Sequence, residues 1–93
     1  MDIMKGKKGL IMGVANERSI AWGISQKLAE SGAKLAFTYL GDALKKRVVP
    51  LAEKLNSNLT FSCDVEKKEE VIKLFEDIKS KWGQIDFIVH AVA

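Results

Sequence analysis

A glycine and a serine that follow an apolar segment are the residues in this chain best suited to bind a phosphate group. Leu10, Ile11 and Met12 precede Gly13, and Ser19 follows further along. Glycine has no Cβ, so the backbone at Gly13 allows close approach of a ligand. Ser19 is suited to cap a following helix, whose free N–H groups and positive dipole end attract anions. The loop from Gly13 to Ser19 therefore predicts a phosphate-binding turn.

The spacing excludes two common phosphate-binding motifs. The next glycine after Gly13 is Gly23, so the fingerprint G-x-G-x-x-G is absent, and no Gly-Lys-Ser/Thr of a P-loop follows. Taken alone, the loop is also compatible with a plain strand-to-helix connection in which Ser19 caps the helix and nothing is bound. Observations on the remaining residues are needed to choose between a phosphate-binding turn and a plain connection.

Composition limits the chain to one small domain. Its 93 residues are 47% hydrophobic, and 15 basic against 12 acidic side chains give a net charge of +3 without a charged block. Nucleic-acid binding is not indicated, and we expect no membrane contact, because no apolar run has the length of a signal peptide or a spanning segment. Cys63 is the single cysteine, and together with His90 it lacks the spacing of a metal site. We therefore expect a cytoplasmic protein without a metal.

Strands and helices are predicted to alternate along the whole chain. Strands are expected at residues 9–14, 34–39, 59–63 and 87–91, and helices at residues 19–31, from Asp42 onward and at residues 67–82. Pro50 should kink the second helix or divide it into two short pieces. Apolar residues at helical spacing predict the inward faces of the three helices: Ile20, Ile24 and Leu28; Leu44, Val48, Leu51 and Leu55; and Val71, Leu74, Phe75, Ile78 and Trp82.

Helical connections of this length imply parallel strands with right-handed crossovers. We predict an α/β fold, the amino-terminal half of a Rossmann-type doubly wound parallel sheet with strand order 3-2-1-4. Such sheets bind ligands outside the carboxyl ends of their strands, where the winding reverses. Gly13, Gly41, Asp42, Asp64 and His90 all stand at these ends. Their coincidence on one edge favours a dinucleotide site over an empty turn.

Several segments together carry a family resemblance. They are Gly6-Lys7-Lys8-Gly9, Gly13-x5-Ser19-Ile20-Ala21-x-Gly23, Ala36-Phe37-Thr38-Tyr39, Cys63-Asp64-Val65 and Phe87-Ile88-Val89-His90. With them the chain resembles the amino-terminal part of bacterial enoyl-acyl-carrier-protein reductases, a divergent branch of the short-chain dehydrogenase superfamily. Ordinary members of that superfamily carry T-G-x-x-x-G-x-G after the first strand and N-N-A-G after the fourth, whereas this chain has the long glycine-to-serine loop and His90-Ala91-Val92-Ala93.

The resemblance implies that the first two strand ends bind the phosphate and ribose parts of NADH. Gly13 would pack against the adenosine side, with Ala15 as a further contact in the same loop. Ser19 and Ile20 would hold the pyrophosphate through the hydroxyl and the helix N-terminal amides. Leu40 stands where the family often has a polar or basic residue near the adenine ribose, so that contact is weakened here.

The same resemblance assigns the base and the path toward the nicotinamide to the other two strand ends. Asp64 would accept a hydrogen bond from the adenine amino group, and Val65 would pack on the ring. Ala91 and Val92 would line the channel from the adenosine to the nicotinamide, where small residues permit close approach.

The activity implied by the resemblance is NADH-dependent reduction of trans-2-enoyl thioesters on acyl-carrier protein in fatty-acid biosynthesis, by a cytoplasmic homotetramer. Residues 1–93 would be a single NAD-binding half domain of a larger single-domain enzyme. The catalytic tyrosine and lysine of the family would lie beyond residue 93, because Tyr39 stands at the adenosine end; we predict that the chain alone is inactive. No Lys or Arg directly follows residues 34–39 to bind a 2′-phosphate, which favours NADH over NADPH, although Lys45 and Lys46 stand one helical turn further on.

Two other classes of protein share this alternation. A phosphate-switch receiver domain would need acidic residues at the end of the first strand to bind Mg²⁺, and this chain has Gly13 there. A stand-alone nucleotide-binding or regulatory module would be complete at this length and stays open. Single residues also have structural interpretations: Asp64 as a turn residue or helix cap, and Cys63 as a small buried apolar residue.

Overall fold

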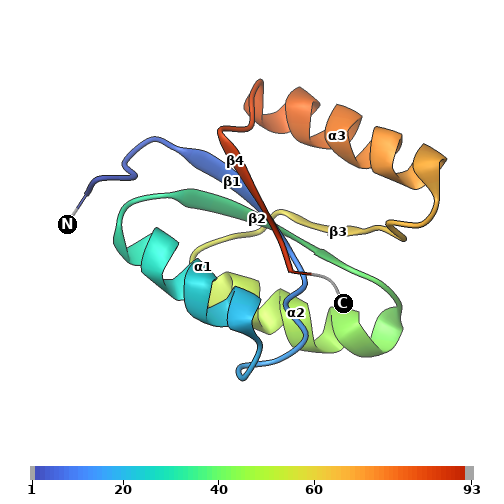
Figure 1. The fold of residues 1–93 in the computed structure, drawn as a ribbon, viewed down its shortest axis with the longest axis horizontal. Helices are drawn as coiled ribbons and strands as arrows, with labels where there is room; N and C mark the ends of the chain where they lie inside the picture. The colour runs from blue at the N-terminus through green and yellow to red at the C-terminus, as the bar shows by residue number, and fades with distance from the viewer. Residues whose placement is uncertain (1, 92–93) are drawn as a thin grey trace.

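The computed structural model describes residues 2–91, in which strands and helices alternate as predicted (Figure 1). The strands are β1 (Lys8–Met12), β2 (Lys34–Tyr39), β3 (Thr60–Ser62) and β4 (Phe87–His90), and the helices are α1 (Ile20–Glu30), α2 (Asp42–Lys54) and α3 (Lys68–Trp82). β2 has the predicted bounds, and the predicted ends of the other strands, α1 and α3 lie within two residues of the observed ones.

The four strands form one parallel sheet in the order β3-β2-β1-β4, which confirms the predicted order. β1 is the inner strand at the point where the winding reverses, because it pairs with β2 on one side and β4 on the other. Ile11 is the Cα partner of Phe37 in β2 and of Val89 in β4. All four carboxyl ends therefore meet at one edge of the sheet.

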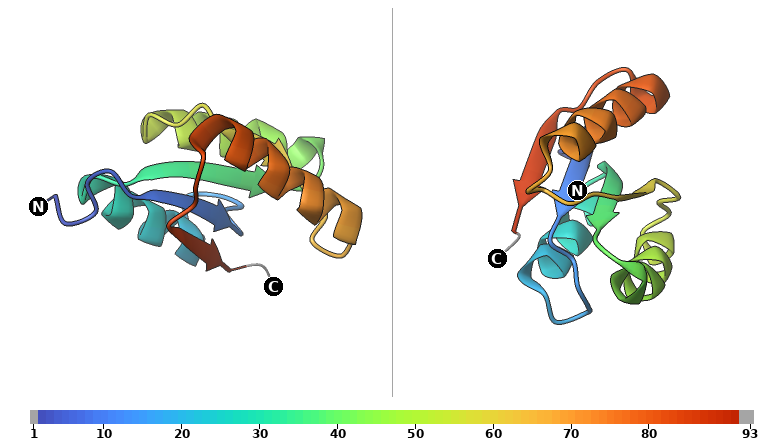
Figure 2. Two further views of the ribbon diagram at one scale, coloured as in Figure 1. Left: turned by 90° about the horizontal axis from the view of Figure 1, so that it is seen from above. Right: turned by 90° about the vertical axis from the view of Figure 1, so that its right-hand side faces the viewer.

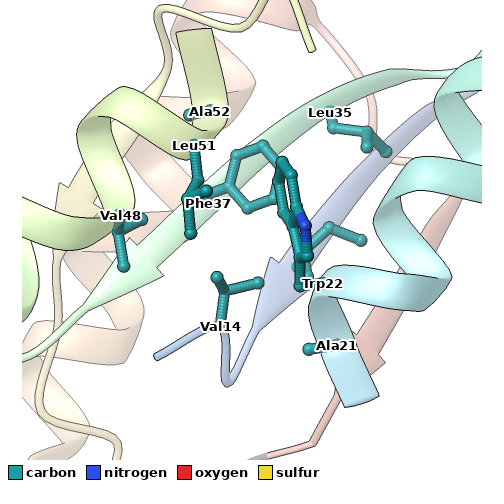
Figure 3. Packing of buried hydrophobic residues seen from close by; sticks show 9 residues of the cluster. Val14, Ala21, Trp22, Leu35, Phe37, Val48, Leu51 and Ala52 are labelled. Atoms are coloured by element: carbon teal, nitrogen blue, oxygen red, sulfur yellow. The ribbon is translucent and has the colours of Figure 1, made fainter. Parts of the chain in front are cut away.

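Helices cover both faces of the sheet: α1 and α2 lie on one face and α3 on the other (Figures 1 and 2). Alternate residues of β1 serve the two faces, since Ile11 belongs to the core under α1 and α2, whereas Leu10 and Met12 belong to the core under α3. Figure 3 shows the first of these cores, with Trp22 of α1 and Phe37 of β2 near its centre. Two covered faces explain why the inner strands are apolar at nearly every position.

The inward face of α1 differs from the prediction. Ile20 is 79% exposed and Ile24 38% exposed, whereas Ala21, Trp22 and Ser25 are buried against the sheet. The hydroxyl of Ser25 donates to the carbonyl oxygen of Ala21 at 2.7 Å, which satisfies a polar group in the core. Leu28, the third residue of the predicted face, is partly buried against the same core. The large Trp22 side chain fills the space above the sheet, so residue type at helical spacing identified the buried face only in part.

α2 is a single helix across Pro50. Of the two predicted outcomes, the division into two short pieces did not occur, and the kink stays a prediction. Proline has no N–H and cannot bond to the carbonyl four residues earlier, that of Lys46. Both Pro50 and Lys46 are exposed, so that carbonyl lies on the side of α2 where water is available. The predicted inner face is confirmed by Val48 and Leu51, which are buried.

No helix within residues 2–91 has the length and apolar character that a membrane crossing requires.

Candidate functional site

A cleft of about 510 Å³ lies at the carboxyl ends of β1, β2 and β3. We call it the carboxyl-end cleft. Its lining consists of residues that end or follow the strands, with one residue of α2: Gly13, Val14, Ala15, Thr38, Tyr39, Leu40, Leu44, Cys63, Asp64, Val65, Glu66 and Ala91. Six predicted site residues are among them: Gly13, Ala15, Leu40, Asp64, Val65 and Ala91. The structure therefore brings together positions that are far apart in the sequence.

Two further hollows occur in the described part of the chain. One of about 660 Å³, the amino-end hollow, is lined by the last turns of α1 and α2, the start of β2 and the loop before β3. The other, of about 490 Å³, lies beside α3 and β4 and includes Phe75, Lys79 and residues 83–88. The three volumes are similar, so size does not identify the functional site. The chemistry of the lining residues has to identify it.

Gly13 makes the turn out of β1 possible. Its φ is +117°, a conformation that side chains with a Cβ rarely adopt. The carbonyl oxygen of Met12, just before it, accepts a hydrogen bond from the amide of Ala91 at 2.8 Å. The turn after β1 and the residue after β4 are thus held together, and they form one wall of the cleft.

Ser19 is the N-cap of α1. Its Oγ accepts from the amide of Trp22 at 3.3 Å and donates to the carbonyl oxygen of Asn16 at 2.8 Å. The Asn16 side chain in turn accepts from the amide of Arg18 at 2.8 Å and rigidifies the loop. Ser19 and Ile20 lie outside the lining of the carboxyl-end cleft, at the start of the helix. The structural interpretation of Ser19 as a cap is correct, and its predicted contact with a pyrophosphate stays a prediction.

The turn after β3 is tightly hydrogen-bonded around Asp64. Its Oδ1 accepts from the amide of Glu66 at 3.0 Å, and its carbonyl oxygen accepts from the amide of Lys67 at 3.0 Å. Its amide donates to Oε1 of Glu70 at 2.9 Å. Within residues 2–91 no hydrogen bond is made by Asp64 Oδ2. Asp64 is therefore a turn residue in the cleft wall, and its Oδ2 has no hydrogen-bond partner among residues 2–91.

The charged residues that line the cleft are both acidic, Asp64 and Glu66. Leu40, at the end of β2, is 52% exposed and contributes an apolar side chain. Lys45 and Lys46 stand on exposed positions of α2, outside the lining. The lining therefore offers hydrogen-bond acceptors and apolar surface to a ligand, and no positive side chain for an additional phosphate group.

Cys63 is buried in the cleft wall, as the sequence predicts. Desolvation by burial raises the pKa of its thiol, and the nearby carboxylates of Glu70 and Asp64 raise it further. Cys63 is therefore a neutral thiol at physiological pH and a poor nucleophile. Its amide donates to the carbonyl oxygen of Tyr39 at 2.9 Å, so the cysteine fixes the ends of β2 and β3 side by side.

Tyr39 lines the cleft, at the adenosine end where the sequence places it, whereas sequence reasoning missed other lining residues: Val14, Thr38, Leu44, Cys63 and Glu66. Thr38 carried a usable signal, because it is a polar residue that follows three apolar residues of its strand, and it is buried at the cleft. Val92, also predicted as a site residue, lies outside the described residues. Among the residues described, no group of three or more His, Cys, Asp or Glu is placed to hold a metal ion.

Comparison with known proteins identifies the family. A family model described as enoyl-(acyl carrier protein) reductase matches residues 13–93. The chain belongs to this family. The resemblance seen in the sequence is thereby confirmed, and the Rossmann-type fold is confirmed by a solved reductase from Candidatus Liberibacter asiaticus that superimposes with a TM-score of 0.94 at 50% identity.

Similar proteins are much longer than this chain. Enoyl-[acyl-carrier-protein] reductase [NADH] 1 of Rhizobium meliloti (strain 1021) is 55% identical over 91 residues, which are 98% of this chain and 34% of that protein. The chain thus spans about a third of the length of such relatives. A reductase from Anaplasma phagocytophilum in complex with NAD superimposes with a TM-score of 0.89 at 50% identity and covers 94% of this chain and 33% of its own. A reductase from Bacillus cereus with NADP+ and indole naphthyridinone has a TM-score of 0.89 at 46% identity. The match covers 95% of this chain and 35% of the Bacillus cereus chain.

Proposed function

We propose that the protein carrying this chain is an NADH-dependent enoyl-acyl-carrier-protein reductase of fatty-acid biosynthesis, which reduces trans-2-enoyl thioesters to acyl thioesters. Residues 1–93 supply the NAD-binding half of a larger single domain. One observation carries the proposal: the carboxyl-end cleft unites residues from separate strand ends, at the edge where a doubly wound sheet binds nucleotides.

The residues present fit the adenosine half of a dinucleotide. The cleft volume of about 510 Å³ lies in the range of small-molecule pockets, roughly 300–1,000 Å³. Gly13 provides a surface without a Cβ beside the start of α1, and the first turn of α1 contains no acidic residue that would repel a phosphate. Asp64 supplies a carboxylate oxygen without a partner among residues 2–91, which suits the amino group of adenine.

The chain's own residues bind and orient the cofactor in this proposal. Ser19 and Ile20 hold the pyrophosphate at the start of α1, and Gly13 and Ala15 lie against the adenosine. Ala91 leads toward the nicotinamide, and its amide is already fixed to Met12. Val92, outside the described residues, continues the same path.

The adenine ring has its own contacts in the proposal. Asp64 accepts from its amino group, Val65 packs on its face, and Leu40 lies near the ribose. Val65 is 37% exposed and Leu40 52% exposed, so both apolar side chains have surface available for a ligand. Covering them would add to the affinity by the hydrophobic effect.

When bound, NADH supplies a hydride for the β-carbon of the enoyl thioester. The tyrosine and lysine that stabilise the enolate stand beyond residue 93 in this proposal, since Tyr39 lies in the adenosine cleft. Ordering the cofactor against the substrate is the contribution of this half, because correct orientation lowers the entropic part of the barrier. The acyl-carrier-protein-linked substrate, the homotetramer and the cytoplasmic location also belong to the proposal.

NADH is favoured over NADPH by the charges of the cleft. Asp64 and Glu66 would repel the dianionic 2′-phosphate, and Leu40 offers it no hydrogen bond. The Rhizobium relative is named as an NADH enzyme, whereas the Bacillus cereus structure contains NADP+, so both cofactors have to be compared directly.

The function is tested by titrating the full-length protein with NADH and by following NADH oxidation in the presence of a trans-2-enoyl thioester. Asp64→Ala should weaken NADH binding, while Glu69→Ala, on an exposed position of α3, should leave it unchanged. The 93-residue chain alone should show no reductase activity. Binding of NADH without any reduction of enoyl thioesters by the full-length protein would contradict the reductase assignment and favour a nucleotide-binding module.

A further inference from the structure

We propose that Glu70 is a positioning residue that fixes Asp64 so that the cleft discriminates adenine from bases without its exocyclic amino group. The inference rests on the proposed function, because it concerns the base-binding end of the carboxyl-end cleft. Glu70 does not line the cleft. Its effect on the ligand is therefore exerted through Asp64.

Glu70 stands in the first turn of α3 but does not cap its own helix. The N-cap residue Lys67 makes no side-chain capping hydrogen bond. A Glu at the third helical position commonly bonds to the amide of the N-cap residue. Here Oε1 of Glu70 reaches three residues further back and accepts from the amide of Asp64 at 2.9 Å. The helix start is thus tied to the loop that forms the cleft wall.

The second oxygen of the Glu70 carboxylate holds the side chain in this direction. Oε2 lies 3.7 Å from Nζ of Lys67, and the amide of Glu70 donates to the carbonyl oxygen of Lys67 at 3.0 Å. The Glu70 side chain is 36% exposed, so the ion pair itself adds little to stability. The ion pair with Lys67 acts on geometry, because it orients Oε1 of Glu70 toward the amide of Asp64.

Asp64 is fixed at three of its four hydrogen-bonding atoms. The amide is bound by Glu70, the carbonyl oxygen by Lys67, and Oδ1 by Glu66. The remaining oxygen, Oδ2, is the one left for a ligand in a residue that lines the cleft. A carboxylate held in this way loses little conformational entropy when a ligand binds, and it cannot turn to suit a different base.

This geometry predicts a specific chemical preference. An ionised carboxylate only accepts hydrogen bonds, so its oxygen attracts the amino group of adenine and repels a carbonyl oxygen at the same ring position. Hypoxanthine carries that carbonyl and otherwise has nearly the shape of adenine. Without Glu70 the Asp64 amide loses its partner, the turn gains freedom, and the preference should shrink.

The test compares reduced nicotinamide adenine dinucleotide with its hypoxanthine analogue in the full-length protein. The variants are Glu70→Ala, Glu70→Asp, Glu70→Gln and the matched control Glu69→Ala. Loss of one hydrogen bond should raise the NADH Kd by about 3–10-fold in Glu70→Ala, with the Kd of the analogue changed less than about twofold. Glu70→Asp, too short to reach the Asp64 amide, should behave like Glu70→Ala.

Rescue separates positioning from general stability. Glu70→Gln keeps an oxygen that accepts from the Asp64 amide, so the preference for NADH should largely return, and Glu69→Ala should match the unchanged protein. KM for NADH should rise in Glu70→Ala while kcat at saturation stays the same. If Glu70→Ala does not fold, Glu70→Asp gives the same comparison.

Three results would overturn the inference, and they are distinguishable. Equal weakening of both dinucleotides in Glu70→Ala would show that Glu70 only supports the fold. Equal affinities of the unchanged protein for both dinucleotides would show that Asp64 does not recognise the amino group. Failure of the unchanged protein to bind either dinucleotide would remove the proposed function itself and the inference with it.

Discussion

The amino-end hollow and the carboxyl-end cleft are similar in size but lie toward opposite ends of the helix dipoles. The hollow, at about 660 Å³, is lined by the last turns of α1 and α2, whereas the cleft, at about 510 Å³, includes Leu44 in the first turn of α2 and the residues that follow the strands. Helix N-termini carry partial positive charge and helix C-termini partial negative charge. The helix dipoles therefore favour an anionic ligand at the cleft and not at the hollow. The side-chain charges are arranged the other way, because Lys34 and Lys54 line the hollow, whereas Asp64 and Glu66 line the cleft.

Internal hydrogen bonding also separates the two regions. In the hollow, Ser57 is buried, and its hydroxyl donates to the carbonyl oxygen of Leu35 at 2.6 Å and accepts from the amide of Leu59 at 3.3 Å. In the cleft, Asp64 has an oxygen without a partner among residues 2–91. The comparison teaches that volume is a poor guide to function, whereas dipole direction and available hydrogen-bonding atoms are informative.

The largest effect is expected from Gly32→Ala in the amino-end hollow. Gly32 has a φ of +99°, and an added Cβ would lie 2.9 Å from the Cα of Lys5. Backbone strain and overpacking together should lower the free energy of unfolding by about 3 kcal/mol. The NADH Kd of the folded variant should not change. Urea unfolding measures the loss, with Gly23→Ala as control.

The control has the opposite expected sign. Gly23 lies within α1, and a Cβ there meets nothing within 4 Å. Alanine should therefore stabilise the helix by about 0.5–1 kcal/mol. Equal destabilisation by both substitutions would show that the close approach of Lys5 to Gly32 does not matter.

The next effect is expected from Ser19→Ala at the start of α1. Loss of the cap should cost about 1 kcal/mol of stability. Loss of a hydrogen bond to the charged pyrophosphate should cost a further 1.5–3 kcal/mol, approximately, in NADH binding. Calorimetric titration and urea unfolding measure the two terms separately. Unchanged NADH affinity would show that Ser19 serves the fold alone.

Ser57→Ala removes a hydroxyl at the other end of the sheet and is compared with Ser19→Ala. It leaves the carbonyl oxygen of Leu35 without its 2.6 Å partner and should cost about 1–3 kcal/mol of stability. NADH binding should be unaffected. A loss of affinity in Ser57→Ala as large as that in Ser19→Ala would break the contrast between the two ends.

A smaller effect is expected for the choice of cofactor. The acidic lining of the cleft should make kcat/KM at least about tenfold higher for NADH than for NADPH, which is about 1.4 kcal/mol. Leu40→Arg should narrow the ratio by offering the 2′-phosphate a positive partner. A higher kcat/KM for NADPH in the unchanged full-length protein would show that Lys45 and Lys46 outweigh the acidic lining.

The smallest effect concerns Cys63 in the cleft wall. Its pKa is raised in the folded protein above the ordinary value of 9.0, so above that pH the unfolded chain binds fewer protons at this group than the folded one. The contribution of Cys63 to stability should therefore be complete below pH 9.0 and decline as the pH rises further. Urea unfolding of the protein and of Cys63→Ala measures the difference. Identical pH dependence would mean that the thiol is not desolvated.

The order of the strands and the edge that carries the cleft could be predicted from the sequence, because both follow from apolar segments separated by helices of suitable length. The residues at the strand ends, such as Gly13 and Asp64, were found for the same reason. The inward face of α1 was not, since Ile24 and Trp22 are both apolar and only the shape of the sheet decides which of them is buried. The reach of Glu70 to the Asp64 amide was also invisible, because the alternative bond to its own N-cap has the same sequence pattern.

The pairing of β1 with two strands from distant parts of the chain has a consequence for synthesis on the ribosome. Lys8 pairs with Lys34 in β2, and Gly9 pairs with Phe87 in β4, so 53 residues separate the appearance of the two partners. At a translation rate of roughly 5–20 residues per second, the edge of β1 that pairs with β4 stays unpaired for about 3–10 s after β2 has been synthesised. An unpaired edge is open to pairing with another nascent chain. Slower translation between residues 34 and 87 should therefore increase aggregation during expression.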